Sequence, residues 1–288
     1  SRGRCDQRRR THPLRARGRP RTRLGRGVSA SALSVERVAA ALRTERYGRS
    51  LQHLASTEST NDDARRAIET GAASGHVIVA DAQTRGRGSR GREWSSPPGT
   101  DLYLSIVDRV SVALPALPPL TLAVGLGVAD AVDALLGRTL AQVKWPNDVL
   151  LDGKKCAGIL IEANSVGDGL DSVVIGIGLN VNRLDFPDTL TTEATSLRLQ
   201  RANHEPLDRD LALAHLLDHL ENWVDRFVRE GAAASVRALE PRLAWLGRRA
   251  RCGDATGVVR GVAPSGALLL ESDRGVVEVI AGRLEPLE

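Results

Sequence analysis

The residues best suited to binding an anion lie in one short segment, residues 83–94, which reads "QTRGRGSRGREW". It contains four arginines and three glycines between the apolar runs "GHVIVA" (75–80) and "DLYLSIV" (101–107). Arginine offers forked donors that match phosphate and carboxylate oxygens. Ordering a loop costs roughly 1–2 kcal/mol per residue, so we expect a bound ligand to drive its closure. The segment is therefore predicted to be a ligand-gated lid over a small polyanion.

Other interpretations of this loop fit the sequence less well. Gly86, Gly88 and Gly91 spell G-x-G-x-x-G, but a dinucleotide-binding fingerprint requires a helix directly after the glycines, and "EWSSPPG" (93–99) follows instead. An RGG-like RNA contact usually comes as repeated motifs, whereas this is a single copy between apolar strands. A solvated, mobile Arg/Gly hairpin remains the plain alternative.

A second stretch, "VKWPNDVLLDGKKCAGILIE" (143–162), carries an amide, a carboxylate and an amine close together. Asn147 and Asp148 lie at a strand end, where Asp148 has the ligand type that Mg²⁺ prefers. Lys155 is one of three lysines in the chain and adjoins a strand expected to be buried. A buried cation needs a partner, and an anionic ligand would supply one; a surface lysine at a hairpin end is the alternative. Cys156 is interpreted as a small core side chain.

The elements that must position these residues alternate between helices and strands. Apolar spacing and caps predict four helices, at 34–43 with Ser34 as N-cap, from after 59–61 to Gly71, at 119–137 and at 207–231. Strands are predicted at 76–80, 102–107, 141–145, 149–163 with a turn at Asp152-Gly153, and 171–182. From about Trp245 short strands with glycine turns follow, which predicts a small β-barrel attached to an α+β body.

Charge is distributed unevenly along the chain. The formal net charge is +5, but residues 1–27 hold eleven arginines and one aspartate, so this segment carries +10 and the other 261 residues sum to −5. A mildly acidic body argues against a simple nucleic-acid binder. The basic segment is predicted to be disordered. It is either a real extension or upstream translation before a start at Val28.

The cellular location of the protein and the redox state of its cysteines are predicted from the absence of membrane, secretory and metal-binding patterns in the sequence. No run reaches the roughly 18–20 continuous apolar residues of a membrane span, and no secretory signal is visible, so we expect a cytoplasmic protein. Cys5, Cys156 and Cys252 are far apart and form no metal spacing, which predicts reduced thiols and no structural zinc.

Four motifs in this order, "STESTND" (56–62), the Arg/Gly loop, "KWPND" with "KKCAGILIE", and "GIGLNVN" (176–182), closely resemble the biotin–protein ligases. The resemblance runs from about residue 50 to the C-terminus. It implies an α+β catalytic domain on a mixed sheet, like that of class II aminoacyl-tRNA synthetases, with a small SH3-like C-terminal domain. The implied division is a basic tail at 1–28, a catalytic domain at 29–244 and the SH3-like domain at 245–288.

The resemblance also implies the reaction and its partners. Biotin and MgATP give biotinyl-5′-AMP and pyrophosphate, and the adenylate then acylates a lysine on the biotin carboxyl carrier domain of an acyl-CoA carboxylase. Joining a carboxylate to an α-phosphate brings two anions together, so fixed positive charge should lower the barrier, and Mg²⁺ would neutralise the departing pyrophosphate. No nucleophile from the protein is needed.

Site residues are carried over where this sequence matches the motifs. The implied biotin-binding residues are Ser59, Thr60, Asn61, Gln83, Gly86, Arg87, Ser89, Lys155, Gly158 and Gly176. The implied nucleotide-binding residues are Arg90, Arg92, Trp94, Asn147 and Asn180. The implied catalytic residues are Lys155, Arg87, Arg90, Arg92 and Asp148, with Asp148 also near the metal.

Two departures from the family pattern carry expectations. The loop reads "GRGSRGR", with Ser89 where the family usually has a second arginine, so we expect the adenylate to be held less tightly. Some members carry an N-terminal DNA-binding winged helix, whereas about 30 protein-like residues precede the "STN" motif here. This favours the monofunctional form, with no specific DNA binding and no membrane partner. The oligomeric state is not indicated.

Three alternative functions remain. A lipoate–protein ligase would share the fold and the adenylation chemistry, but the full forms of "GRGSRGREW" and "KWPND" favour biotin. A non-enzymatic nucleic-acid or anion binder would use the basic tail and the loop. A ligase-like fold that binds biotin without adenylating it is disfavoured by Lys155 and Asp148.

Overall fold

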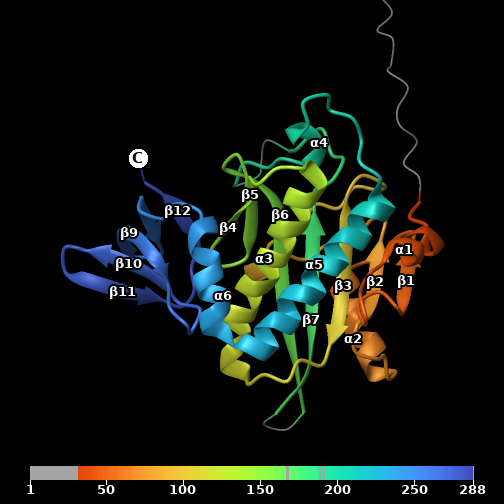
Figure 1. The fold of residues 1–288 in the computed structure, drawn as a ribbon, viewed down its shortest axis with the longest axis horizontal. Coiled ribbons are helices and arrows are strands. Elements are labelled where there is room, and N and C mark those ends of the chain that lie inside the picture. Colours follow the sequence, from red (N-terminus) through yellow and green to blue (C-terminus); the bar gives the residue numbers. More distant parts are fainter. Residues whose placement is uncertain (1–31, 167–168, 188–189, 191, 288) are drawn as a thin grey trace, which may run out of the picture.

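The body of the protein is built on one mixed seven-stranded sheet with strand order β1-β2-β3-β7-β6-β5-β4 (Figure 1). The computed structural model describes residues 32–166, 169–187, 190 and 192–287. Only β1 and β2 pair in parallel, and every other neighbouring pair is antiparallel. The strands are β1 (Leu51–Leu54), β2 (His76–Ala80), β3 (Leu102–Asp108), β4 (Gln142–Lys144), β5 (Asp148–Leu151), β6 (Lys154–Val166) and β7 (Gly169–Leu179). The predicted α+β class with a mixed sheet is confirmed.

One face of this sheet is covered by long helices and forms the main core. Figure 1 shows α3 (Leu117–Leu136) and α5 (Arg209–Glu230) running across it, with α6 (Ala232–Leu239) beside them. Leu104, Ile177 and Ile159 are cross-strand neighbours on this face, and all three are buried. In α3, a Cβ on Gly127 would lie 3.1 Å from the backbone oxygen of His219, so this glycine lets α3 approach α5 closely.

The apolar composition of this central helix is accounted for by its packing. Among the described residues, the helical stretch Leu114–Leu136, which comprises the 3-10 turn η2 (Leu114–Ala116) and α3, is the one that is long and apolar enough to cross a membrane. Its most apolar window is 67% buried inside the protein. A buried core helix has these same properties.

The other face of the sheet is only partly covered. Helix α2 (Thr60–Glu69) packs there on Ile78, Val107 and Val174. The next positions along β3, β6 and β7 on this face are Ser105, Leu160 and Gly176, followed by Tyr103, Gly158 and Gly178. Small and polar residues therefore follow the apolar patch under α2, and the candidate site is built over them.

The C-terminal residues form a separate five-stranded antiparallel sheet with strand order β11-β10-β9-β8-β12. Its strands are β8 (Arg249–Cys252), β9 (Ala255–Val262), β10 (Leu268–Ser272), β11 (Gly275–Val279) and β12 (Leu284–Pro286). The segment that leads into it contacts β4, where Ala244 N donates to Val143 O at 2.9 Å, and the connection between β9 and β10 contacts the body, where Gly266 O accepts from Trp145 Nε1 at 2.9 Å. The predicted change to short strands after about Trp245 is confirmed. The barrel closure, the SH3-like likeness and the domain boundaries stay predictions.

Several local details differ from the sequence predictions. Strand β1 and helix α6 were not predicted. Helix α2 begins at Thr60, inside the "STN" motif, with Ser59 at the N-cap position but without a capping hydrogen bond from its side chain. Smaller elements are α1 (Val35–Ala41), α4 (Leu197–Gln200) and the 3-10 turns η1 (Ser89–Gly91) and η3 (Glu240–Arg242). The Trp145-Pro146 peptide bond is cis. The predicted disordered tail and Cys5 lie outside the described residues.

Two local predictions are matched closely by the backbone. Ser34 caps α1, because its side chain accepts a hydrogen bond from Arg37 N at 3.3 Å. Asp152 and Gly153 form the turn between β5 and β6, with φ of 50° and 72°. Two consecutive residues in this region of φ are what a two-residue hairpin turn requires.

Candidate functional site

A slot lies on the sheet face that α2 leaves open. Its floor includes the cross-strand neighbours Gly158 and Gly178, and Asp148 pairs with Gly158 next to the slot. Side chains alternate along strands, so these positions share one face. The slot is lined by Ser59, Thr60, Asn61, Gln83, Arg87, Gly88, Ser89, Trp94, Leu104, Asn147, Lys155, Gly158, Ile159, Leu160, Gly176, Ile177 and Gly178.

The glycines of the floor make room for Trp94. A Cβ on Gly158 would lie 2.8 Å from Trp94 Cζ3 and 3.1 Å from Lys155 Nζ, and a Cβ on Gly178 would collide with the indole. The indole therefore rests directly on backbone. A side chain at either glycine would displace both the ring and the adjoining part of the loop.

A concentrated positive charge lies at one end of the slot. Lys155 Nζ lies 2.6 Å from Asp148 Oδ1 and 5.1 Å from the centre of the Trp94 ring. On the other side of the same carboxylate, Lys144 Nζ lies 3.8 Å from Asp148 Oδ2. Burial lowers the pKa of Lys144, and the carboxylate of Asp148 acts in the opposite direction. Two ammonium groups against one carboxylate leave net positive charge for an anion.

Asp148 is engaged by lysines rather than grouped with other metal ligands. Within the described ranges there is no group of three or more His, Cys, Asp or Glu side chains that could hold a metal ion. The donor set therefore fits a magnesium ion that arrives on the phosphates of a nucleotide better than one held in a protein cage. The assignment of Asp148 to the metal stays a prediction.

The other end of the slot is polar and lies at the start of α2. Gln83 Oε1 accepts hydrogen bonds from Thr60 N at 2.9 Å and Thr60 Oγ1 at 3.2 Å. Asn61 Oδ1 accepts one from Ser105 Oγ at 2.6 Å, and a Cβ on Gly176 would collide with this amide. Ser59, Thr60 and Asn61 are all buried. These side chains form a preset hydrogen-bonding surface, and their contact with biotin stays a prediction.

The Arg/Gly loop folds back on itself above the slot. Gly88 N donates to Arg92 O at 2.7 Å, and Trp94 N donates to Gly86 O at 2.8 Å. The tip turns at Arg90 and Gly91, with φ of 60° and 69°. Gly86 is pressed against the backbone of Trp94, where a Cβ would collide with its oxygen. The loop is thus held in a defined shape by its own backbone.

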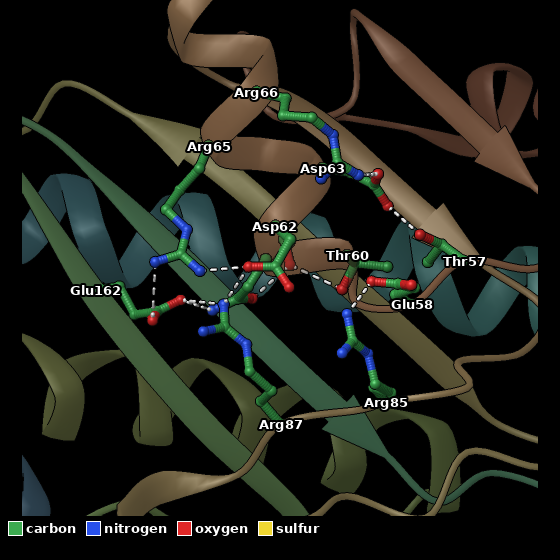
Figure 2. A network of polar contacts seen from close by, with 12 residues as sticks. Thr57, Glu58, Thr60, Asp62, Asp63, Arg65, Arg66, Arg85, Arg87 and Glu162 are labelled. Atoms are coloured by element: carbon green, nitrogen blue, oxygen red, sulfur yellow. Dashed lines mark hydrogen bonds and ion pairs between the residues drawn. The ribbon is translucent and has the colours of Figure 1, made fainter. Parts of the chain in front are cut away.

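The three predicted arginines of the loop point in different directions. Arg87 Nη2 lies 2.9 Å from Glu162 Oε2 and 3.0 Å from Asp62 Oδ1 (Figure 2). Arg90 donates to the backbone oxygen of Gly282, in the connection between β11 and β12 of the C-terminal sheet. Arg92 donates to Ser89 O at 3.2 Å and Ser89 Oγ at 3.0 Å. Arg87 lines the slot, Arg92 lines the neighbouring cavity, and Arg90 lines neither of these two.

A second cavity adjoins the slot and shares Gly88, Ser89, Trp94 and Lys155 with it. Lys155 N donates to Glu193 O at 2.8 Å, so the segment around residue 193 runs beside the lysine. Arg183 stacks on Phe186, with 4.8 Å from the guanidinium carbon to the ring centre. The remaining lining residues are Arg92, Glu93, Ser95, Asn180, Arg183, Phe186, Leu190, Thr192 and Ala194.

Two of the predicted nucleotide-binding amides are largely used by the fold. Asn147 Nδ2 donates to Ile159 O at 2.7 Å, and Asn180 Nδ2 donates to Thr195 O at 3.0 Å. Asn180 lines the second cavity, whereas Asn147 lines the slot. Both amides therefore shape the walls, and what they offer a ligand is mainly their oxygen atoms.

Two buried donors point to a ligand that carries acceptors. Within the described part of the chain, Trp94 Nε1 and Arg87 Nε are buried without a hydrogen-bond partner. Both residues line the slot. Buried donors nearly always have a hydrogen-bond partner in folded proteins, so acceptor atoms of a bound ligand would supply the partners of these two donors.

Sequence reasoning missed three residues of this site. Gly178 could have been predicted from the sequence, because Gly176 and Gly178 alternate in one strand and so share a face. The sequence indicates Lys144 less strongly, since only its place in the same motif as Asp148 points to the site. Nothing in the sequence indicates Glu162, because it contacts Arg87 and Asn61, which lie far from it in sequence. The distance from Asn61 Nδ2 to Glu162 Oε2 is 2.6 Å. Cys156 is buried with a raised thiol pKa caused by burial, which agrees with a core role.

Comparison with known proteins gives consistent matches. Residues 53–180 match the Biotin/lipoate A/B protein ligase family. The Bifunctional ligase/repressor BirA of Bacillus spizizenii is 34% identical over 259 residues, which is 88% of this chain and 79% of the relative. The Biotin–[acetyl-CoA-carboxylase] ligase of Mycobacterium tuberculosis is 37% identical over 247 residues, 81% of this chain and 88% of the relative.

Solved structures lead to the same family. The structure of biotin protein ligase from Aquifex aeolicus in complex with biotin and ATP superimposes with a TM-score of 0.71 at 28% identity. The match covers 82% of this chain and 98% of that one. It therefore includes most of the described body and not merely the stretch that carries the sequence motifs. The chain belongs to the biotin protein ligase family.

Proposed function

We propose that this protein joins biotin to ATP as biotinyl-5′-AMP and transfers the biotinyl group to a lysine of a biotin carboxyl carrier domain. The observation that carries this proposal is the position of Lys155. Its side chain belongs to the walls of both cavities. A ligand in the slot and a nucleotide in the second cavity would meet at this ammonium.

Lys155 supplies fixed positive charge where the two substrates join. In the first step a carboxylate oxygen of biotin attacks the α-phosphorus of ATP, the bond to the β-phosphate bridge breaks, and pyrophosphate leaves. Negative charge from both partners collects at that point, so a preorganised cation lowers the barrier. Asp148 holds the ammonium at 2.6 Å and thereby fixes its place. Lys155 is thus the catalytic residue, and Asp148 positions it.

The polar end of the slot favours biotin over lipoate. With the biotin carboxylate at Lys155, the ureido ring would lie toward Ser59, Thr60 and Gln83, which supply hydroxyl and amide groups for its N–H and C=O. A dithiolane ring has no N–H or C=O with which to match the remaining hydrogen-bonding capacity of these groups, and a site built for hydrogen bonds discriminates against such a ligand. Lipoate is therefore proposed to be the weaker of the two substrates.

The second cavity is proposed to take the nucleotide. Its lining combines the cations Arg92 and Arg183 with the aromatic rings of Trp94 and Phe186. The arginines can bind phosphates, and the aromatic rings can stack on a planar base. Magnesium is proposed to arrive with ATP and to neutralise the departing pyrophosphate.

The second step needs a carrier lysine as partner. Its neutral amine attacks the acyl carbon of the adenylate, the bond to the phosphate oxygen breaks, and AMP leaves as the amine loses a proton. The thiol of Cys156 takes no part, because it is fully buried and hydrogen-bonded to Val149 O at 3.4 Å. The carrier of an acyl-CoA carboxylase is the proposed acceptor, and a cytoplasmic location remains our expectation.

One experiment tests the substrate and the reaction together. Pyrophosphate release from MgATP is measured with biotin and with lipoate, and a biotin carboxyl carrier domain is then added for mass spectrometry. We expect release with biotin, followed by a biotin-sized mass gain on one carrier lysine. Release with lipoate alone would identify a lipoate ligase. No release with either acid from folded protein would favour a non-catalytic anion binder, whose affinity for nucleic acid should then depend on residues 1–27.

A further inference from the structure

Glu162 lies at the far end of the slot from Lys155, on the same face of β6. Gly158, Leu160 and Glu162 alternate along this strand, and the first two line the slot. The side chain of Glu162 is 23% exposed. Its carboxylate contacts three groups: Asn61 Nδ2 at 2.6 Å, Arg87 Nη2 at 2.9 Å and Arg65 Nη1 at 3.6 Å. Figure 2 shows Arg65 and Arg87 reaching this carboxylate from opposite sides.

We propose that Glu162 is a positioning residue for biotin, which closes the far end of the slot by fixing Asn61 and Arg87. This inference rests on the proposed function and concerns the same site. Glu162 itself is not among the residues that line the slot, so it acts through the two side chains that do.

The first effect of Glu162 is on the direction of an amide. An Asn side chain has a donor end and an acceptor end of similar shape, so its surroundings decide which end faces which way. A carboxylate only accepts, so Glu162 must receive the NH₂ group of Asn61. The oxygen of Asn61 is thereby turned toward Ser105, at 2.6 Å. Without Glu162 the amide could rotate and present the wrong group at the polar end.

The second effect is on the loop. Arg87 is the loop arginine that lines the slot, and its guanidinium bridges Glu162 on β6 and Asp62 on α2. Asp62 also pairs with Arg65, so two arginines and two carboxylates form a compact neutral cluster (Figure 2). Because Arg87 follows Gly86 directly, fixing its side chain fixes the start of the loop. Hydrogen bonds between charged partners are stronger than neutral ones, which suits this anchoring role.

The alternative is that Glu162 merely stabilises the fold. A stabilising residue would change the melting temperature, whereas a positioning residue should change biotin affinity with little effect on the rate at saturation. Arg87 also has a buried Nε without a partner among the described residues, so its placement matters for a ligand atom as well as for the protein. The two roles therefore predict different measurements.

The test uses the full chain with Glu162→Gln and Glu162→Ala. Biotin dissociation constants are measured by calorimetry, and kcat by biotin-dependent pyrophosphate release. We expect Glu162→Ala to weaken biotin binding on the order of 10-fold to 100-fold, the loss of one or two charge-assisted hydrogen bonds. The value of kcat at saturating biotin should stay within about twofold of wild type. Glu162→Gln keeps an acceptor for Asn61 and should lose less.

A second readout follows the loop itself. Trypsin cleaves after arginine, and Arg85, Arg87, Arg90 and Arg92 all lie in the loop. Without ligand, Glu162→Ala should be cut there faster than wild type. The matched control is Glu58→Ala, which removes the exposed ion pair with Arg85 at the start of the same loop but touches no residue at the slot's end (Figure 2). It should leave both biotin affinity and kcat within about twofold of wild type.

The outcomes separate this inference from the proposed function. Wild type that binds no biotin would refute the proposed function. Active wild type with Glu162→Ala and Glu162→Gln both binding biotin within twofold would overturn the role of Glu162. If Glu162→Ala does not fold, biotin affinity is compared for Glu162→Gln, Arg87→Ala and the double variant. A loss of binding free energy in the double variant smaller than the sum of the two single losses supports coupling between Glu162 and Arg87, and a fully additive loss refutes it.

Discussion

Lys155 Nζ lies 2.6 Å from Asp148 Oδ1, with the Trp94 ring centre 5.1 Å away on another side. One carboxylate and one indole thus hold a single ammonium at the wall between two cavities. The carboxylate contributes a full charge and the ring a weaker attraction. The position of the cation is set before any substrate binds, which is the condition for electrostatic catalysis.

Replacing this lysine should abolish most of the first step. We expect Lys155→Met to lower biotin-dependent pyrophosphate release on the order of 10²-fold to 10³-fold, because the charge that faces the developing anion is lost. Lys155→Arg should not restore it, since the wider guanidinium does not fit between Asp148 and Trp94. The control is Lys154→Met, whose side chain is 47% exposed and pairs with Glu193. Equal losses at both lysines would contradict this role.

The slot floor should not tolerate a methyl group. Gly178→Ala places a Cβ within the indole of Trp94, and we expect about 1–3 kcal/mol of lost stability together with weaker biotin binding. Urea unfolding and calorimetry measure the two effects. Trp94→Ala removes the obstacle, so adding Gly178→Ala to it should have little further effect on stability. Additive losses in the double variant would show that the glycine matters for another reason.

The buried lysine on β4 should make stability depend on pH in the alkaline range. Burial lowers the pKa of Lys144 from its usual value of 10.5. Between the lowered folded value and 10.5 the unfolded chain binds more protons, so the free energy of unfolding contributed by this group rises with pH. Relative to Lys144→Met, wild type should therefore gain stability as the pH rises from the lowered folded pKa of Lys144 toward 10.5. Urea unfolding across this range checks it.

A matched substitution separates this effect from general alkaline changes. Lys154→Met removes a lysine on β6, two strands away from β4, with a side chain that is 47% exposed. It is the control for removing a lysine side chain from the surface. If Lys144→Met and wild type change in parallel instead, the amine of Lys144 does not titrate differently in the folded and unfolded chain.

Ser89 should set how tightly the adenylate is retained. It accepts hydrogen bonds from Arg92, and the family resemblance implies an arginine at this position. We expect Ser89→Arg to slow release of biotinyl-5′-AMP, because the added donor lies beside both cavities. Filter binding of labelled adenylate in the absence of carrier measures the rate. Ser89→Ala controls for the lost hydroxyl, and equal release by Ser89→Arg and wild type would refute the expectation.

The regular part of the fold could be predicted from local patterns. The hairpin at Asp152 and Gly153 has the φ values that its turn residues favour, and α1 begins at a serine that caps it. Strand β1, "LQHL", was not predicted because it is short and carries polar residues, although it pairs with β2. Helix α6 was not predicted because Gly231 indicates the end of a helix, whereas a second helix starts directly after it.

The site was predictable where the motif itself carries the chemistry. Lys155, Trp94 and the "STN" residues are together in the slot. The directions of the loop arginines were not, because Arg87 and Arg90 are directed by Glu162 and Gly282, which lie far away in sequence. Local patterns fix backbone shape, whereas the partner of a long flexible side chain depends on the assembled fold.

The contact between Arg90 and the backbone of Gly282 joins the tip of the loop to the C-terminal sheet. The loop is predicted to be a lid, and opening it would break or move this contact. Thermodynamic linkage makes the coupling free energy of the contact reciprocal. Ligand binding that favours the closed loop would therefore also favour the docked C-terminal sheet, and a change that loosens the sheet would weaken ligand binding by that same coupling free energy.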